Sequence, residues 1–304
     1  MDLTRVTVFC FTASYVVAFV AEALGLVGRQ RAWLTGGRRL VTLGFAVAGV
    51  FAHAVYLALR AREQATPLSS PQDWYLLAAL VLAAVYLATV LRTRRWSLGV
   101  FALPSVLVLI AVSRTASGEP FSPDRASLFW GQAHGWTLLG ATVSLTLGFL
   151  AALMRIIQDR RLKAKLPPTA GFSLPSLEWL DGAGGRANTV STWLVGGGFL
   201  SGLVLTTLKR DAGDGYSVWT DPVVLALGLM LAWLIAAAVW RNRQPSARRG
   251  ATSAWLAVAS FVLMAVTLAT VTLVGAVHGP AAPADPASGG TGSAATAASA
   301  DRGA

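Results

Sequence analysis

Long apolar runs alternate with short polar stretches along the chain, and the polar stretches hold most of the charged residues. About 20 apolar residues in a helix cross the roughly 30 Å of hydrocarbon in a bilayer. The pattern therefore predicts an all-α polytopic membrane bundle with about eight transmembrane helices. Their expected positions are residues 6–27, 40–60, 74–91, 97–113, 134–157, 190–208, 222–240 and 253–277.

The end of the chain has a different composition. Residues 279–304 consist mostly of Ala, Gly, Ser and Pro, with almost no bulky apolar side chain, so they cannot bury a core. We expect one transmembrane domain over residues 1–278 and a disordered tail over residues 279–304.

Composition and charge agree with a membrane protein and indicate its orientation. Hydrophobic residues make up 55% of the chain and charged residues only 13%, against about a quarter charged in ordinary soluble domains. Of the 25 Lys and Arg, 17 fall in one alternate set of connections and 8 in the other set with the termini. The positive-inside rule places the richer set in the cytoplasm, which predicts both termini outside. The net charge of +11 then belongs to these loops, and no nucleic-acid partner is expected.

The longest cytoplasmic connection expected is 158–189. Within it, Ser176 precedes Leu177, Glu178, Trp179 and Leu180. A serine followed by an acidic residue favours a helix start, and these apolar side chains suit the headgroup layer. This pattern predicts a short interfacial helix with a structural role.

Three histidines are the main candidates for chemistry. His134 opens the fifth run and His278 closes the eighth, which places both at the outer membrane surface. His53 lies 13 residues beyond Leu40, or about 20 Å up a helix that rises from the cytoplasm. One interpretation is that these are interfacial residues or hydrogen-bond partners of neighbouring helices. The other is that two imidazoles from different helices ligate one haem iron.

Other residues refine these alternatives. Arg60 follows His53 by seven residues on the same helical face, so it either pairs with a haem propionate or extends to the interface. A zinc site is weaker, because neither HxxH nor HExxH spacing occurs. Cys10 is the only cysteine and excludes an intramolecular disulfide or CxxC pair. Glu22 in the first run is interpreted as the partner of a nearby arginine, or as a proton or ligand contact.

A polar loop separates the sixth and seventh runs. It covers residues 209–222 with the sequence KRDAGDGYSVWTDP. Trp219 is a candidate for packing on a planar ligand. Asp221 either fixes the loop or caps the helix whose first position is Pro222. Gly198 and Gly202 in the preceding run have the spacing that lets helices approach closely, which indicates packing.

Four segments in order resemble one known family. They are Ala52–Arg60 with the following Pro67-Leu-Ser-Ser, the span from His134 to Arg160–Lys165, Leu174-Pro-Ser-Leu-Glu-Trp-Leu-Asp181, and Trp219-Thr-Asp221-Pro222. Together they are similar to the cytochrome c assembly protein family, the CcsA/HemX-like group of polytopic membrane proteins.

The resemblance implies a haem-handling role in cytochrome c biogenesis in a bacterial inner (plasma) membrane. By position it assigns His134 and His278 as ligands of the iron of haem b, with Trp219 against the porphyrin and His53 as a substitute internal ligand. The implied partners are haem, membrane lipid, other cytochrome c assembly proteins and apocytochrome c. The implied role is haem delivery rather than independent catalysis.

Two departures from the family pattern keep a second function open. Trp219 is alone in its loop, and no histidine occurs between His134 and His278. The alternative is a HemX-like regulatory or scaffolding protein of haem biosynthesis that binds no haem.

Overall fold

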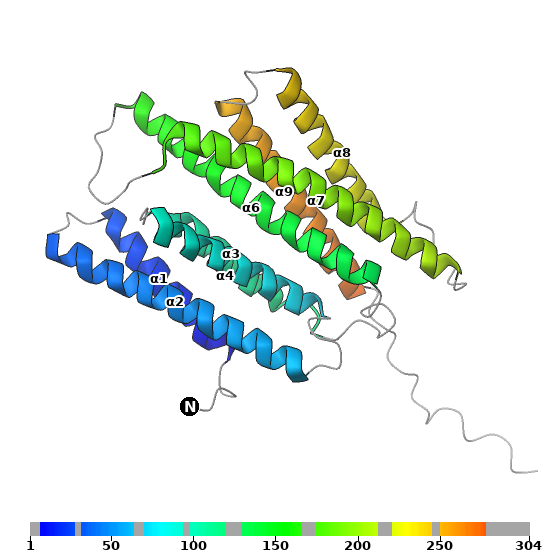
Figure 1. Cartoon of the computed structure of the whole chain (residues 1–304), viewed down its shortest axis with the longest axis horizontal. Coiled ribbons are helices and arrows are strands. Elements are labelled where there is room, and N and C mark those ends of the chain that lie inside the picture. Colours follow the sequence, from blue (N-terminus) through cyan, green and yellow to red (C-terminus); the bar gives the residue numbers. More distant parts are fainter. Residues whose placement is uncertain are drawn as a thin grey trace, which may run out of the picture.

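The computed structural model describes residues 7–27, 32–63, 70–93, 98–118, 129–165, 174–211, 221–244 and 250–277. Within these ranges it contains helices and no strand (Figure 1). The helices are α1 (Val8–Val27), α2 (Ala32–Glu63), α3 (Pro71–Thr93), α4 (Gly99–Ser113), α6 (Phe129–Lys163), α7 (Leu177–Asp211), α8 (Pro222–Arg243) and α9 (Ala251–Val277). The all-α prediction is confirmed.

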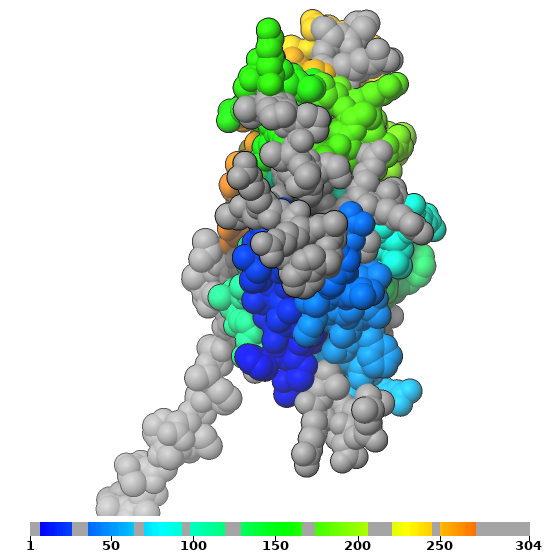
Figure 2. Space-filling model, turned by 90° about the vertical axis from the view of Figure 1, so that its left-hand side faces the viewer, coloured from blue at the N-terminus to red at the C-terminus, as the bar shows by residue number. Residues whose placement is uncertain are grey.

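The helices form two groups, α1–α4 and α6–α9 (Figure 1). Helix α6 connects the groups because it packs against α3 and α4 as well as α7 and α9. Two apolar cores are present. Tyr15, Leu82 and Leu103 are buried in the first, which extends to Leu150 of α6 and Leu180 of α7, and Val195 and Leu234 are buried in the second. Figure 2 shows α1 and α2 side by side on one face of the molecule.

The outward-facing surface of the bundle is apolar. Phe9, Phe51 and Trp193 expose 78%, 64% and 80% of their surface. Seven of the described helices are also long and apolar enough to cross a membrane, and α4 is a shorter apolar helix. Such a surface is unfavourable in water but suits lipid, where helices satisfy their own backbone polar groups. The chain is therefore a multi-pass membrane protein.

The prediction of a separate, short interfacial helix after Ser176 is wrong. Ser176 does precede a helix, and its Oγ accepts the Trp179 N–H at 3.4 Å. However, this helix continues as α7 to Asp211, and Leu180 is only 1% exposed instead of lying among headgroups. The cause is packing against α6, where Gly148 faces Ala187 closely and Ser144 donates to the Ala187 carbonyl at 2.9 Å. This packing offsets the poor helix propensity of the glycines in the first turns of α7.

Successive helices run in opposite directions, so the start of α1 and the end of α9 lie at the same end of the bundle (Figure 1). We call this the outer end, following the charge bias, and the opposite one the inner end. The expected tail over residues 279–304 lies outside the described residues.

The orientation is tested by labelling single cysteines. In a Cys10→Ser background, Thr115→Cys at the outer end should react with a membrane-impermeant maleimide in intact cells. Gln244→Cys at the inner end should react only after permeabilisation, because the bilayer blocks the reagent. Both positions are exposed, so differences in burial do not confound the comparison. The reverse labelling pattern would invert the assigned orientation.

Candidate functional site

The outer end holds the described members of the predicted haem site. His53 in α2 is 0% exposed and stacks on Phe11 of α1, with ring centroids 4.0 Å apart and planes 1° apart. The Tyr15 hydroxyl lies 3.5 Å from its Nδ1. Among the described residues, no hydrogen-bond partner reaches its Nε2. The prediction that His53 hydrogen-bonds a neighbouring helix fits this geometry, and the stack also makes it a packing residue.

His134 has a different environment, in the second turn of α6. Its Nδ1 lies 2.7 Å from the Gly198 carbonyl oxygen of α7. A Cβ added at Gly202 would approach the imidazole Cε1 to 3.0 Å, so the glycine leaves room for the ring. The close approach expected from the glycines of α7 is therefore present, and it accommodates a histidine.

The two histidines lie in different helix groups, since the described contacts of His53 are with α1 and that of His134 is with α7. An aromatic contact joins the groups at the same end. Trp74 of α3 and Trp136 of α6 meet edge to face, with centroids 5.5 Å apart. His278 and Trp219, the other predicted haem contacts, lie outside the described residues.

Arg60 makes an ion pair inside the protein. Its Nε lies 2.5 Å from Oδ1 of Asp73, and its Nη2 donates to Gln72 Oε1 at 3.1 Å. Asp73 is 0% exposed and also accepts from Ser70 Oγ at 2.6 Å. These bonds tie the end of α2 to the start of α3. Arg60 therefore has a structural role here, and its pairing with a propionate stays a prediction.

Asp73 was missed by the sequence interpretation, although a signal was present. Ser70 and Asp73 have the spacing of a capping box, and the Asp73 N–H donates back to Ser70 Oγ at 3.2 Å. Asp221 shows the same kind of role at α8. Its Oδ1 accepts from the N–H groups of Val223 at 2.7 Å and Val224 at 3.3 Å. The simpler prediction for Asp221, a helix cap before Pro222, is confirmed.

Two polar contacts at the inner end were also not foreseen. Arg155 of α6 donates from Nε to Asp181 Oδ1 of α7 at 2.7 Å. The other oxygen of Asp181 accepts the Gly250 N–H, just before α9, at 3.3 Å. Asp181 thus fastens three helices together. It belongs to the Leu174–Asp181 segment that carried the resemblance, so that segment has a structural function in this chain.

Glu22 of α1 is buried, and its Oε1 accepts from the Tyr86 hydroxyl of α3 at 3.2 Å. Its carboxylate lies against the first turn of α4, since a Cβ at Gly99 would fall 2.0 Å from Oε2. Arg38 is the arginine that attracts Glu22, and it acts at longer range than a direct ion pair. In the described part of the chain, no cluster of three His, Cys, Asp or Glu side chains could hold a metal ion.

No family model, curated protein or solved structure matches this chain. The resemblance to the CcsA/HemX-like group therefore stays a prediction from the sequence segments.

Asp73→Ala tests the contact between α2 and α3. We expect it to destabilise the protein by about 1–3 kcal/mol, because it removes charged hydrogen bonds and leaves the Arg60 guanidinium without this partner. Thermal unfolding in detergent micelles measures the change. Glu63→Ala is the matched control, since Glu63 is an exposed carboxylate at the same end of the bundle. Equal unfolding temperatures for the two variants would show that the buried pair contributes nothing.

Proposed function

We propose that the protein handles haem at the outer end of the bundle, as a member of the CcsA/HemX-like group acting in cytochrome c biogenesis. The observation that carries the proposal is the 2.7 Å contact between His134 Nδ1 and the Gly198 carbonyl. A carbonyl accepts a hydrogen bond and does not donate one, so it assigns the proton of a neutral ring to Nδ1. The lone pair is then on Nε2, the nitrogen that would meet a metal.

This arrangement is the usual one for metal-ligating histidines. Their second ring nitrogen commonly donates to a carbonyl or carboxylate, which fixes both the tautomer and the orientation of the ring. Gly202 supports it further, because it leaves room for the imidazole, and Gly198 lets α7 approach Leu138 of α6 closely. The donor is neutral imidazole in an apolar bundle, which fits haem iron better than a hard cation.

The second proposed ligand is His278, which directly follows α9 in the sequence. Helices α6 and α9 pack against each other, and α9 ends at the end of the bundle where α6 begins. Trp219 is proposed to pack on the porphyrin. Trp219 precedes Asp221 by two residues in the sequence, and Asp221 caps the first turn of α8. His53 is the candidate for a second, internal ligand.

In this proposal the chain's residues bind and orient haem b at the membrane surface. Haem would supply the reactive vinyl groups, and a partner apocytochrome c the thiols. The chain itself positions haem and is not a stand-alone catalyst. The partners proposed are apocytochrome c and other cytochrome c assembly proteins, in a bacterial plasma membrane.

A second candidate is a HemX-like regulatory or scaffolding protein that binds no haem. The observations in its favour are the stacking of His53 on Phe11 and the pairing of Arg60 with Asp73. Both side chains have partners within the protein, so neither needs a haem to explain its position.

An absorption spectrum of the purified protein separates the two candidates. In mild detergent, the wild type should show a Soret band, or acquire one with added haem. The double variant His134→Ala/His278→Ala should lose it, because both proposed ligands are gone. A wild type that is colourless and takes up no added haem would refute the haem proposal.

His53→Phe is the control, since it keeps an aromatic ring against Phe11 and removes a histidine at another place. Its Soret band should persist if the outer pair ligates the iron. An unchanged spectrum in the double variant would reject only the ligand assignment. Loss of the band in His53→Phe with retention in the double variant would move the ligand to α2.

A further inference from the structure

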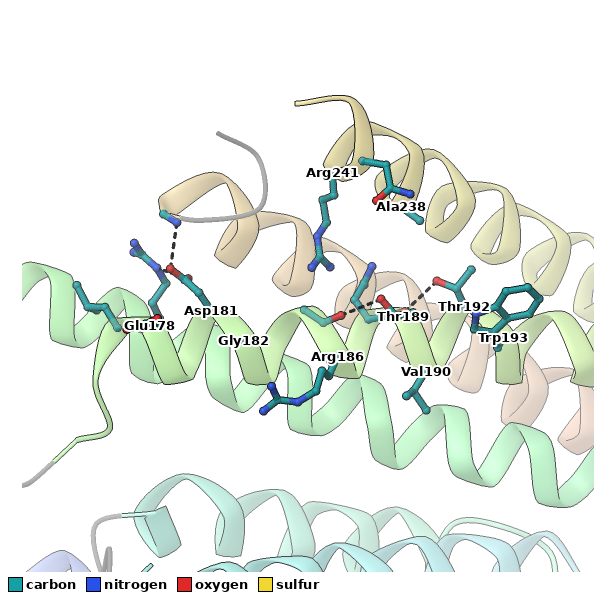
Figure 3. A pocket seen from close by; sticks show the side chains of 16 residues that line it. Glu178, Asp181, Gly182, Arg186, Thr189, Val190, Thr192, Trp193, Ala238 and Arg241 are labelled. Carbon is teal, nitrogen blue, oxygen red and sulfur yellow. Dashed lines mark hydrogen bonds and ion pairs between the residues drawn. The ribbon is translucent and has the colours of Figure 1, made fainter. Parts of the chain in front are cut away.

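A large groove with both charged and apolar walls lies at the inner end, between α7 and α8. Its volume is about 1770 Å³, and it is open to the outside of the bundle. Figure 3 shows α7 along its floor and α8 above it. The groove is at the opposite end from His134, so what it binds does not depend on the haem proposal.

Cations line this groove in excess. Arg155, Arg186 and Arg241 contribute to its wall, against the carboxylates of Glu178 and Asp181. Asp181 is already neutralised by Arg155 at 2.7 Å. The lining therefore holds three arginines against two carboxylates, an excess of one positive charge. The α7 and α9 helices begin here and α8 ends here, so helix dipoles of both signs meet at the groove, and the arginines supply the excess positive charge.

Arg241 is the main candidate among the arginines of the groove for binding an anion. Its side chain points from α8 towards α7 (Figure 3), and its Nε is buried. A Cβ at Gly185 would lie 2.6 Å from its Nη2, so the guanidinium rests directly on the glycine. A glycine inside a helix makes that helix less stable than alanine would. At position 185, the absence of a side chain leaves room for the guanidinium group of Arg241.

Two common explanations exist for such an arginine. It can interact with the negative end of α8, and it can belong to the basic residues that gather at the cytoplasmic side of a membrane protein. Arg243, two residues further on, fits both explanations, since it is exposed and does not line the groove. Arg241 differs in its burial and in its contact with a neighbouring helix. Arg243 is therefore a suitable control for Arg241, because both lie at the same end of α8.

The groove is apolar away from the arginines. Val190 and Trp193 of α7 line it and expose 48% and 80% of their surface, and Ala238 lines it from α8. Trp193 lies eight residues beyond Gly185, or about 12 Å along the helix axis towards the membrane centre. A molecule filling the groove would meet cations at the membrane surface and apolar side chains deeper in the hydrocarbon.

We propose that this groove binds a phosphate-bearing anion, the headgroup of an anionic phospholipid, with its phosphate at Arg241 and an acyl chain along Val190 and Trp193. Guanidinium groups bind phosphate oxygens through paired charged hydrogen bonds. Basic pockets between transmembrane helices at the cytoplasmic side favour anionic lipid headgroups. Inorganic phosphate has the same head chemistry, but it would leave the apolar half of the groove uncovered. The lipid is therefore the better match.

Native mass spectrometry of the full chain in nonionic detergent tests the proposal. Phosphatidylglycerol and phosphatidylcholine with identical acyl chains are titrated separately. Wild type should bind phosphatidylglycerol more tightly, and Arg241→Gln should weaken that binding about tenfold, the effect of losing a charged hydrogen bond. Phosphatidylcholine binding should change little. Gly185→Ala keeps the charge but displaces the guanidinium, so it should also lower the preference for phosphatidylglycerol.

Arg243→Gln is the control and should bind like wild type. Equal binding of the two lipids by wild type would overturn the proposal. So would an equal loss in Arg243→Gln and Arg241→Gln, because general positive charge would then explain the preference. In a third arm, inorganic phosphate is added alone and thermal unfolding is followed. Stabilisation that depends on Arg241 and matches that of phosphatidylglycerol would support the phosphate site with a free anion as its occupant.

Discussion

The antiparallel contact between α6 and α7 is the interaction on which the rest of the structure depends. Polar contacts join these helices near both ends and in the middle: His134 to Gly198, Ser144 to Ala187, and Arg155 to Asp181. Between hydrocarbon chains, apolar side chains alone give helices little reason to prefer one partner over another. These polar contacts fix the register of the pair. Because α6 also packs against α3, α4 and α9, the same pair positions both helix groups.

Charged residues lie towards the ends of the bundle, and two ion pairs there join neighbouring helices. Arg60 with Asp73 connects α2 to α3 at the outer end, and Arg155 with Asp181 connects α6 to α7 at the inner end. Moving an unpaired charge into hydrocarbon is costly, and pairing each buried carboxylate with an arginine offsets part of that cost. The central parts of the helices can then be almost entirely apolar. The proposed haem site and the proposed headgroup site each use polar residues at one end of the bundle.

The two histidines with described surroundings illustrate how position alone is not enough to assign a role. Both were predicted in the outer part of the membrane. His53 is stacked on Phe11 in the core of the first group, whereas His134 is held through Nδ1 by a carbonyl of the neighbouring helix. The second geometry is the usual one for a metal ligand, whereas the first packs the ring in the core and leaves its Nε2 without a described hydrogen-bond partner. The difference comes from the residues that other helices place beside each ring.

The fold class, the number of described helices and several helix starts follow from the residue pattern of the chain alone. Apolar length is a property of one segment, so eight apolar runs predict eight helices without knowledge of their partners. Capping is equally local, which is why Ser176 and Asp221 could be recognised as helix starts. Tertiary structure alone decided that α7 continues through its early glycines, and that His134 meets Gly198, 64 residues away. It also decided that Arg241 rests on Gly185. These features depend on which helices lie side by side, and hydropathy carries no information about that choice.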